Sequence, residues 1–489
     1  MRILIQFFIL FALTNVNAQI SFYKLYSGNS FDKGEGIVQL EDSSYVITGS
    51  SGSWQESSQA FLLKIDSLGN YKWSQQYGGP ESETGKRVLY NSDLGFYIAG
   101  FTNSFGAGDF DAYLVKTDLN GTKIWEKNYG KPGNWERIND AVMALDSGIV
   151  MVGESIDLAN GNSDVFVIKT DKNGDTLWTK RFGSVGEDIA NTIVKLNNNY
   201  LIGGQYFIPD SNMVKGFVIE MNDNGAINRF DTISHLIGNY VVNDISVGVN
   251  KFYIAGYRIV NSTNHDAYCG VYDNSGQLIN HYTTGDGGEI RNERFMQIAY
   301  NSIKNKVAIG YQNINSSTFQ DNFDLVFAYF DPTELYWLSQ FQSLNNEGLD
   351  EVNEVLCTSD GGYIAIGTNE STGESEFTTN GGSNIYLMKI DKNDVYPTVS
   401  GAPILNQLVG IEINSENVKG KVFPNPFKDE FTIELENSEI TKAIILNSLG
   451  QEIESIDFKS SCVFSSAHLK NGTYFLKIGN SVTKLIKLN

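Results

Sequence analysis

The sequence has few of the residues that most often carry enzyme chemistry, since its 489 residues include only three cysteines and four histidines. The cysteines are Cys269, Cys357 and Cys462. The histidines are His235, His265, His281 and His468. An odd cysteine count without C-x-x-C spacing predicts neither a disulfide framework nor a zinc site, and we expect buried strand residues instead. The histidines form no metal-spaced or nucleophile–base motif, so the sequence predicts no cofactor, no metal and no recognisable catalytic residue.

Basic residues are also scarce, because 36 Lys and Arg stand against 57 Asp and Glu, for a formal net charge of −21. Like charges repel, which argues against nucleic acid and against anionic membranes as partners. The acidic residues are spread along the chain, which favours a solvated surface over a dedicated site. Neutral or cationic partners, such as a glycan or a protein, fit this balance better.

Long apolar runs are missing except at the N-terminus, where Met1 and Arg2 precede an apolar stretch at residues 3–13. Val16, Asn17 and Ala18 follow, and the pattern predicts a signal peptide, residues 1–18, that is cleaved after Ala18. A membrane anchor is the alternative, but the run is shorter than the roughly 20 residues that span a bilayer. We therefore expect a mature chain with no transmembrane segment, which is exported and is a monomer.

A repeat dominates the region that follows. The phrase YLVKTDLNGTKIW at residues 113–125 returns as VIKTDKNGDTLW at 167–178, and an earlier copy occupies 63–73. Its anchor positions are 66, 118, 171, 222, 273, 331 and 391. Between the anchors lies a short β-branched or aromatic run that ends in glycine, as at Gly49, Gly100 and Gly153. Such runs predict strands.

Each repeat supplies four strands, a to d, over about 50 residues, which is the spacing of a β-propeller blade. The seventh anchor has no tryptophan strand after it, whereas residues 21–27 resemble that strand with no anchor before them. We therefore predict an all-β fold with a seven-bladed β-propeller at residues 19–397, in which residues 21–27 close the last blade. A ring of six or eight blades is the alternative.

The recurring residues have structural interpretations beside functional ones. Asp-x-Asn-Gly between two strands predicts a tight hairpin that is capped by the aspartate, with a calcium loop as the alternative. The tryptophans at 73, 125, 178 and 337 share one position within the repeat and should pack between blades. Stacking of these rings against a sugar is the functional alternative. Acidic residues recur at Glu83, Glu136, Glu187 and Glu347, but nothing in the sequence selects a catalytic pair from them.

The loops between strands b and c are long and varied, and variable loops on a rigid ring are where binding is usually placed. We expect any ligand face there, near the central channel. The candidate aromatic residues on this face are Trp54, Phe105, Phe110, Trp135 and Phe319.

After residue 397 the repeat stops, and a linker-like stretch at 398–419 leads to a compact strand-rich module at 420–489. Its blocks include VFPNPF at 422–427, IILNSLGQE at 444–452 and LKNGTYFLKI at 469–478. In this order they resemble the type A C-terminal sorting domain of the Bacteroidetes type IX secretion system. The motif residues are Pro424, Asn425, Pro426, Gly450, Gly472, Tyr474, Lys484 and Lys487.

That resemblance implies an immunoglobulin-like β-sandwich that is read by the type IX translocon, with passage through the periplasm to the outside or to the outer-membrane surface. The propeller resembles repeats of secreted proteins that mostly have no assigned activity. We therefore expect a non-enzymatic extracellular binding protein. An extracellular polysaccharide hydrolase or lyase and a purely structural surface component are the alternatives.

Overall fold

The computed structural model divides into two compact units, Met1–Asn406 and Gln407–Asn489, which are described separately. The expected signal peptide lies outside the described residues. The structure describes residues 21–28, 30–53, 57–107, 109–233, 238–261, 264–284, 292–314, 323–335, 337–342, 350–369, 383–394, 406–407, 412–415, 418–423, 430–435, 440–446, 452–465, 468–470, 472–478 and 481–487.

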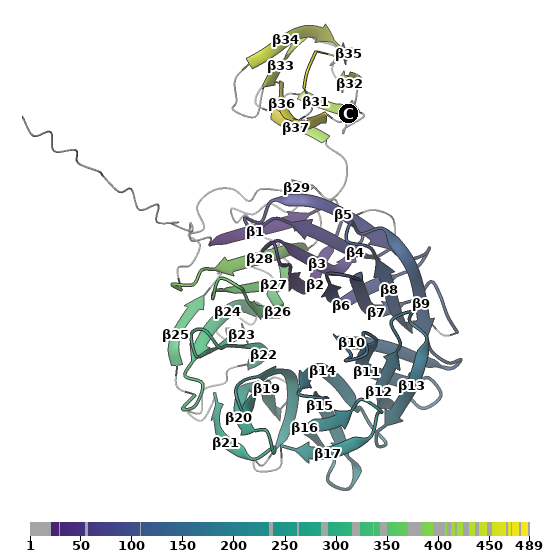
Figure 1. The fold of residues 1–489 in the computed structure, drawn as a ribbon, viewed down its shortest axis with the longest axis vertical. Coiled ribbons are helices and arrows are strands. Elements are labelled where there is room, and N and C mark those ends of the chain that lie inside the picture. Colours follow the sequence, from purple (N-terminus) through teal and green to yellow (C-terminus); the bar gives the residue numbers. More distant parts are fainter. Residues whose placement is uncertain are drawn as a thin grey trace, which may run out of the picture. The chain divides into compact units, whose positions relative to one another are not determined.

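The first unit is a β-propeller, in which radial antiparallel sheets surround a central axis (Figure 1). Its described residues form seven sheets, which are named here by their order in the chain. Sheet 1 contains β2 (Asp32–Gln39), β3 (Tyr45–Ser51), β4 (Gln59–Ile65) and β5 (Tyr71–Tyr77). Sheet 2 contains β6 (Glu83–Asn91), β7 (Gly95–Thr102), β8 (Asp111–Thr117) and β9 (Lys123–Tyr129). Sheet 3 contains β10 (Asn134–Met143), β11 (Ile149–Asp157), β12 (Ser163–Thr170) and β13 (Thr176–Phe182).

The next three sheets repeat this arrangement, with the first strand innermost and the last outermost (Figure 1). Sheet 4 contains β14 (Ile189–Leu196), β15 (Asn199–Ile208), β16 (Met213–Asn222) and β17 (Ile227–Thr232). Sheet 5 contains β18 (Asn239–Val247), β19 (Lys251–Asn261), β20 (Asn264–Asp273) and β21 (Leu278–Thr283). Sheet 6 contains β22 (Asn292–Asn301), β23 (Lys306–Ile314), β24 (Phe323–Phe330) and β25 (Trp337–Gln342). Among the described residues, the one helical element is a 3₁₀ turn at Pro209–Ser211.

Sheet 7 joins the two ends of the propeller. It has the order β26 (Asp350–Cys357), β27 (Tyr363–Asn369), β28 (Asn384–Ile390), β1 (Phe22–Ser27) and β29 (Asn406–Gln407). β1 runs antiparallel to β28, with Phe22 opposite Lys389 and Tyr26 opposite Ile385. The N-terminal strand therefore completes a sheet whose other main strands come from the end of the repeat region.

The core lies between neighbouring sheets because their middle strands are apolar on both faces. Every residue of β8 is buried, for example, whereas the outer strand β13 is mostly exposed. One buried cluster combines Val150 and Val152 of sheet 3 with Tyr200 and Ile202 of sheet 4. Near-continuous apolar runs in the middle strands are what burial on both faces requires.

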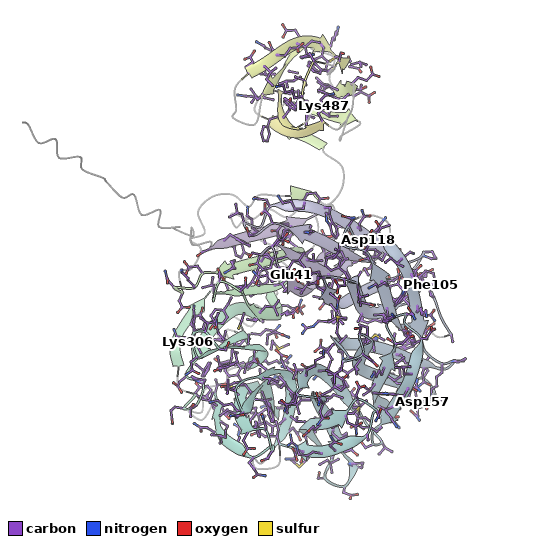
Figure 2. All side chains as sticks on the ribbon, in the orientation of Figure 1. Glu41, Phe105, Asp118, Asp157, Lys306 and Lys487 are labelled. Carbon is purple, nitrogen blue, oxygen red and sulfur yellow. The ribbon has the colours of Figure 1, made fainter. Side chains whose placement is uncertain are left out.

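The turns between third and fourth strands confirm the capping role that the sequence predicts for their aspartates. Asp118 Oδ1 accepts hydrogen bonds from the backbone N–H groups of Asn120 and Thr122, both at 2.8 Å. Gly121 has φ +80°, and a Cβ there would lie 2.8 Å from the ring of Trp73. The same relation joins Gly174 to Trp125, so these tryptophans pack against the turn of the next sheet. Asp118 lies at the outer edge of the ring (Figure 2).

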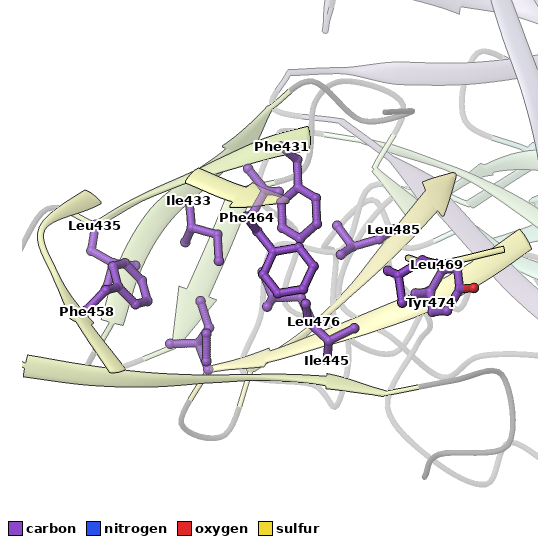
Figure 3. Packing of buried hydrophobic residues seen from close by; sticks show 13 residues of the cluster. Phe431, Ile433, Leu435, Ile445, Phe458, Phe464, Leu469, Tyr474, Leu476 and Leu485 are labelled. Atoms are coloured by element: carbon purple, nitrogen blue, oxygen red, sulfur yellow. The ribbon is translucent and has the colours of Figure 1, made fainter. Parts of the chain in front are cut away.

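The second unit is a β-sandwich of two four-stranded antiparallel sheets. One sheet contains β30 (Glu412–Ser415), β31 (Val418–Phe423), β32 (Glu430–Leu435) and β35 (Ser461–Ser465). The other contains β34 (Glu452–Lys459), β33 (Ile440–Leu446), β36 (Gly472–Ile478) and β37 (Ser481–Lys487). Phe431, Phe464 and Leu476 meet in its core (Figure 3). β30 pairs with β31, so this unit includes residues that the sequence interpretation places in the 398–419 linker.

Candidate functional site

A β-bulge marks the same place on each of the seven innermost strands. In β10 the pairing with β11 shifts between Ile138 and Asp140, so that Asn139 is left unpaired. Equivalent shifts occur in all the other innermost strands. Bulges re-aim side chains, and these residues line a central cavity. The bulge ring comprises Glu35, Lys86, Asn139, Asn191, Asn243, Met296 and Asn353.

Asparagines of the bulge ring bind the backbone of the next sheet in one repeated geometry. Asn139 Nδ2 donates to Ala190 O at 3.0 Å, and Asn191 Nδ2 donates to Val242 O at 2.8 Å. Asn243 and Asn353 donate in the same way to Phe295 O and Gly34 O, at 2.8 and 2.7 Å. Each acceptor immediately precedes the next bulge, so these amides tie neighbouring sheets together around the cavity.

A second layer of side chains, one residue further along these strands, contains carboxylates around an arginine. Arg87 Nε lies 3.1 Å from Asp140 Oδ1, and Arg87 Nη1 forms an ion pair with Glu354 Oε1. Thr192 Oγ1 donates to Asp244 Oδ1 at 3.0 Å. We call Arg87, Asp140, Asp244 and Glu354 the carboxylate layer.

Each carboxylate of this layer also accepts a backbone N–H of the following sheet. The Ile193 N–H donates to Asp140 at 2.8 Å, and the Ile298 N–H donates to Asp244 at 2.9 Å. The Ile37 N–H donates to Glu354 at 2.6 Å. These acids therefore join sheets 3 to 4, 5 to 6, and 7 to 1.

Burial is the main cause of the altered acidity in this layer. Burial, together with nearby Asp140, raises the pKa of Asp244 from 3.8 to about 7, although the Ile298 N–H and Arg87 oppose the rise. Burial also raises the pKa of Glu354 from 4.5 to about 7, although Arg87 opposes the rise. Burial disfavours the charge of Arg87, but Asp140 and Glu354 outweigh this and raise its pKa. A buried group of three carboxyls with one arginine explains these directions.

Two cavities meet at the carboxylate layer. One, of about 220 Å³, is lined by the bulge ring together with Arg87, Asp140 and Asp244. The other, of about 340 Å³, is lined by later residues of the same strands, including Lys195, Ser246 and Tyr300. Asp32, the first residue of β2, pairs with Ser51, and Ser51 pairs with Gln59 at the start of β4. The start of the innermost strand therefore lies at the end of the sheet that carries the b–c loop. Because the smaller cavity is lined by earlier residues of the innermost strands than the larger cavity, it is nearer this end.

The structure separates the aromatic residues that the sequence suggests for the ligand face. Trp54 and Phe319 lie outside the described residues. Phe105 stacks on Tyr113 and lies toward the outer edge of the ring (Figure 2). Phe110 and Trp135 do meet, with ring centroids 5.5 Å apart in a T-shaped contact.

Arg137 lies against this aromatic pair. Its guanidinium carbon is 4.8 Å from the centroid of Phe110 and 5.1 Å from that of Trp135. Trp135 Nε1 donates to Asp109 Oδ2 at 3.2 Å. Both rings are half-buried, so the pair is a packed part of the b–c loop face.

Two of the four recurring acids, Glu83 and Glu136, cap loops. Glu83 accepts hydrogen bonds from Thr102 Oγ1 at 2.7 Å and from the Gly79 N–H at 3.0 Å. Glu136 accepts from Ser155 Oγ and from Arg181, at 2.9 and 2.8 Å. In sheet 4 this role belongs to Asp188, which accepts from the Phe207 N–H at 2.6 Å, and not to Glu187. Asp188 follows Phe182 by six residues, as Glu83 follows Tyr77. Glu347 lies outside the described residues.

The cysteines and histidines bring no further chemistry together. Burial raises the pKa of all three thiols, that of Cys357 to about 12. His265 packs edge-on against Tyr257, and His468 lies 3.0 Å from Glu454. His235 is outside the described residues. Within the part of the chain that the structure describes, no group of three His, Cys, Asp or Glu is suited to hold a metal.

Among the sorting-motif residues, Pro424, Asn425, Pro426 and Gly450 lie outside the described residues. Gly472 begins β36, and Lys484 and Lys487 belong to β37. Tyr474 is buried, and its hydroxyl donates to Lys470 O at 2.7 Å. Tyr474 thus stabilises the loop before β36.

Sequence reasoning misses both the bulge ring and the carboxylate layer. A signal exists, because asparagine followed by a polar and then an apolar residue recurs at repeat spacing, as at Asn139-Asp140, Asn191-Thr192, Asn243-Asp244 and Asn353-Glu354. It is weaker than the aspartate–glycine phrase, because sheets 1, 2 and 6 depart from it.

The chain is thus a β-propeller with a C-terminal β-sandwich. Residues 421–488 match the model of the secretion system C-terminal sorting domain family. The second unit is therefore a sorting domain, and the chain is secreted by the type IX system to the cell surface or the extracellular space. No helix among the described residues is long and apolar enough to cross a membrane.

No curated protein matches the chain. Solved structures with a similar fold include a puromycin hydrolase mutant complexed with PGG, at 8% identity and a TM-score of 0.48, covering 82% of this chain and 60% of that one. Drosophila Semaphorin 1b extracellular domains 1–2 match at 7% identity and a TM-score of 0.42, covering 76% and 85%. The propeller domain of the Trilobed protease from Pyrococcus furiosus matches at 9% identity and a TM-score of 0.38, covering 72% and 93%. This chain thus spans 60% of the hydrolase chain.

Proposed function

We propose that this chain is a secreted, non-enzymatic binding protein whose propeller presents its ligand face on the side of the b–c loops. One observation carries the proposal. Asp140, Asp244 and Glu354, the carboxylates at the channel, each accept a backbone N–H of the next sheet. A carboxylate held in this way joins sheets and is poorly placed to exchange protons with a substrate.

The second candidate is an extracellular polysaccharide hydrolase. It is favoured by the pKa of Asp244, which burial raises to about 7 beside a cavity. A general acid in a glycosidase needs such a raised pKa. It also needs a second carboxylate free to act as nucleophile or base, and Asp140 and Glu354 are each engaged by Arg87 and a backbone N–H.

A polysaccharide screen separates the two candidates. The chain from residue 19 onward would be incubated with a panel of insoluble and immobilised neutral, acidic and amino polysaccharides. Retained protein and released reducing sugar would both be measured. Retention without release is expected. Release that Asp244→Asn abolishes would instead establish the hydrolase. If the chain is not retained and no sugar is released, both candidates are contradicted.

A further inference from the structure

The bulge ring has hydrogen-bonding capacity that the fold does not use. Asn139, Asn191, Asn243 and Asn353 each commit Nδ2 to a carbonyl of the next sheet. Their Oδ1 atoms accept no hydrogen bond from any described residue, and none of them is buried from solvent. A primary amide has two N–H donors and one carbonyl acceptor. All four amides therefore keep an acceptor for a ligand. Asn139 and Asn191 also keep a donor, whereas Asn243 Nδ2 makes a second contact with Met296 Sδ at 3.5 Å and Asn353 Nδ2 one with Thr368 Oγ1 at 3.4 Å.

The bond to the next sheet also fixes each amide in place. An amide that is anchored at one N–H can present its remaining groups with little further loss of side-chain freedom. Preorganised groups bind with a smaller entropy cost than mobile ones. The bulges therefore give the cavity a set of oriented amide groups at one level of the channel.

The charges around the cavity argue against ionic ligands. Both basic side chains that line it are already paired, Lys86 with Glu35 at 2.5 Å and Arg87 with Asp140 and Glu354. An anion would have to break these pairs. Among the described residues no group of three His, Cys, Asp or Glu could hold a metal ion. Met296 and Val352 are the apolar residues of the lining, which is too little for a hydrophobic ligand.

What remains is a neutral ligand whose groups both donate and accept hydrogen bonds. Hydroxyl groups do both, and a ring of hydroxyls matches a ring of amides. The cavity, at about 220 Å³, is smaller than the roughly 300–1,000 Å³ of sites for drug-sized ligands. We infer that the bulge ring is a binding site for a single neutral sugar residue. This rests on the proposed binding function and names its site and ligand class.

The test compares two asparagines that join sheets in the same way. Asn191→Leu removes an amide from the cavity together with its bond to Val242 O. Asn280→Leu, on outer strand β21, removes the bonds from Asn280 Nδ2 to Thr333 O and Glu334 O, 3.3 and 3.1 Å long, without touching the cavity. Unfolding midpoints of both variants would show that each folds. Asn243→Leu is the second cavity variant, which is used if Asn191→Leu does not fold.

The probes are methyl glycosides of glucose, galactose, mannose and N-acetylglucosamine, with glucosamine, glucuronic acid and calcium chloride as charged comparators. Binding to the chain from residue 19 onward would be followed by saturation-transfer NMR and titration calorimetry. We expect at least one neutral glycoside to bind the unchanged chain. Its affinity for Asn191→Leu should be lower by at least about tenfold, which corresponds to about one good hydrogen bond. Its affinity for Asn280→Leu should be unchanged.

Other results would overturn the inference in distinguishable ways. Neutral glycosides that bind Asn191→Leu and the unchanged chain equally would place the site elsewhere and leave the proposed binding function intact. The same holds for polysaccharide retention without any binding of the monosaccharide probes. Preferential binding of glucosamine or calcium would replace the neutral ligand with a cation. Failure of both the polysaccharide and the glycoside screens would contradict the proposed function itself.

Discussion

Arg87 on β6 and Glu354 on β26 form an ion pair that joins sheet 2 to sheet 7 across sheet 1. Gly36 occupies the corresponding position of sheet 1 and has no side chain to obstruct it, and a Cβ there would lie 2.8 Å from Lys86 O. Segments from the two ends of the repeat region are therefore joined at two radii. β1 pairs with β28 toward the outside, and Arg87 links the innermost strands at the channel.

Replacing Arg87 should destabilise the propeller strongly. Arg87→Met leaves Asp140 and Glu354 buried without their cation, and breaking a buried pair from one side costs about 3–5 kcal/mol. Urea unfolding should show this loss in the free energy of unfolding. Lys127→Met removes an exposed pair with Asp175 and should change it by less than about 0.5 kcal/mol.

A second substitution tests whether the unpaired charge is the cause. In Arg87→Met with Glu354→Gln, one buried carboxylate becomes neutral, so part of the lost free energy of unfolding should return. If the double variant is less stable than Arg87→Met alone, Arg87 stabilises the fold mainly by packing and not by its charge.

The raised pKa of Glu354 predicts how stability depends on pH. Its folded value of about 7 exceeds the ordinary value of 4.5, so the folded chain binds this proton more tightly than the unfolded chain does. The free energy of unfolding should therefore fall as pH rises from about 4.5 to about 7, and then level off. For one group the fall is on the order of 3 kcal/mol. The pKa of Asp244 is raised in the same direction, so Asp244 should add to this fall in the free energy of unfolding.

Glu354→Gln removes the contribution of Glu354. Relative to the unchanged chain, this variant should gain stability between pH 4.5 and pH 7 by about the same 3 kcal/mol. Urea midpoints at pH 5, 6, 7 and 8 would measure the difference, with Glu126→Gln on outer strand β9 as the control for loss of a partly exposed carboxylate. Parallel pH profiles for the unchanged chain and Glu354→Gln would contradict the prediction.

A feature of this fold can be predicted from the sequence when the contacts that produce it lie within one hairpin or one repeat. Asp118 caps a turn within its own hairpin, and the tryptophan strand recurs in phase with it, so both are visible in the repeat. The similarity of Phe22–Ser27 to the tryptophan strands predicts its place in a sheet by the same argument. The bulge at Asn139, however, arises from the register between β10 and β11, which neither strand shows alone. The Arg87–Glu354 pair joins residues 267 positions apart, and no repeat phrase links them.

Gly121 offers a test of how the tryptophans hold the sheets. Gly121→Ala meets two penalties, because φ is +80° and the new Cβ would lie 2.8 Å from the Trp73 ring. Gly133 has a similar φ of +83°, but nothing lies within 4 Å of its added Cβ. Gly133→Ala should cost about 1 kcal/mol, and Gly121→Ala about 1–3 kcal/mol more. Near-ultraviolet circular dichroism should change only in Gly121→Ala, and equal losses in the two variants would argue against packing by Trp73.

The role of β1 in closing the propeller can be tested by truncation. A chain that begins at Ser21 keeps the strand, whereas one that begins at Gly28 loses Phe22, Leu25 and Tyr26, all of which are buried. It also loses the hydrogen bond from the Tyr26 hydroxyl to Gly69 O, 2.7 Å long, and exposes the edge of β28. Burying such side chains is worth about 1.5–3 kcal/mol each, so the shorter chain should be less stable by roughly 5 kcal/mol or more.

An exposed strand edge also invites pairing with another chain, so the shorter chain should form oligomers on size-exclusion chromatography. A synthetic peptide of residues 21–28 should pair with β28 and restore both the monomer and the unfolding midpoint, since strand addition re-forms the same hydrogen bonds. Tyr26→Phe in the longer chain removes only the hydroxyl group and should lower the free energy of unfolding by about 1 kcal/mol. If the two truncated chains unfold at the same urea concentration and both remain monomeric, β1 does not close the ring, and its pairing with β28 contributes little to the stability of the propeller.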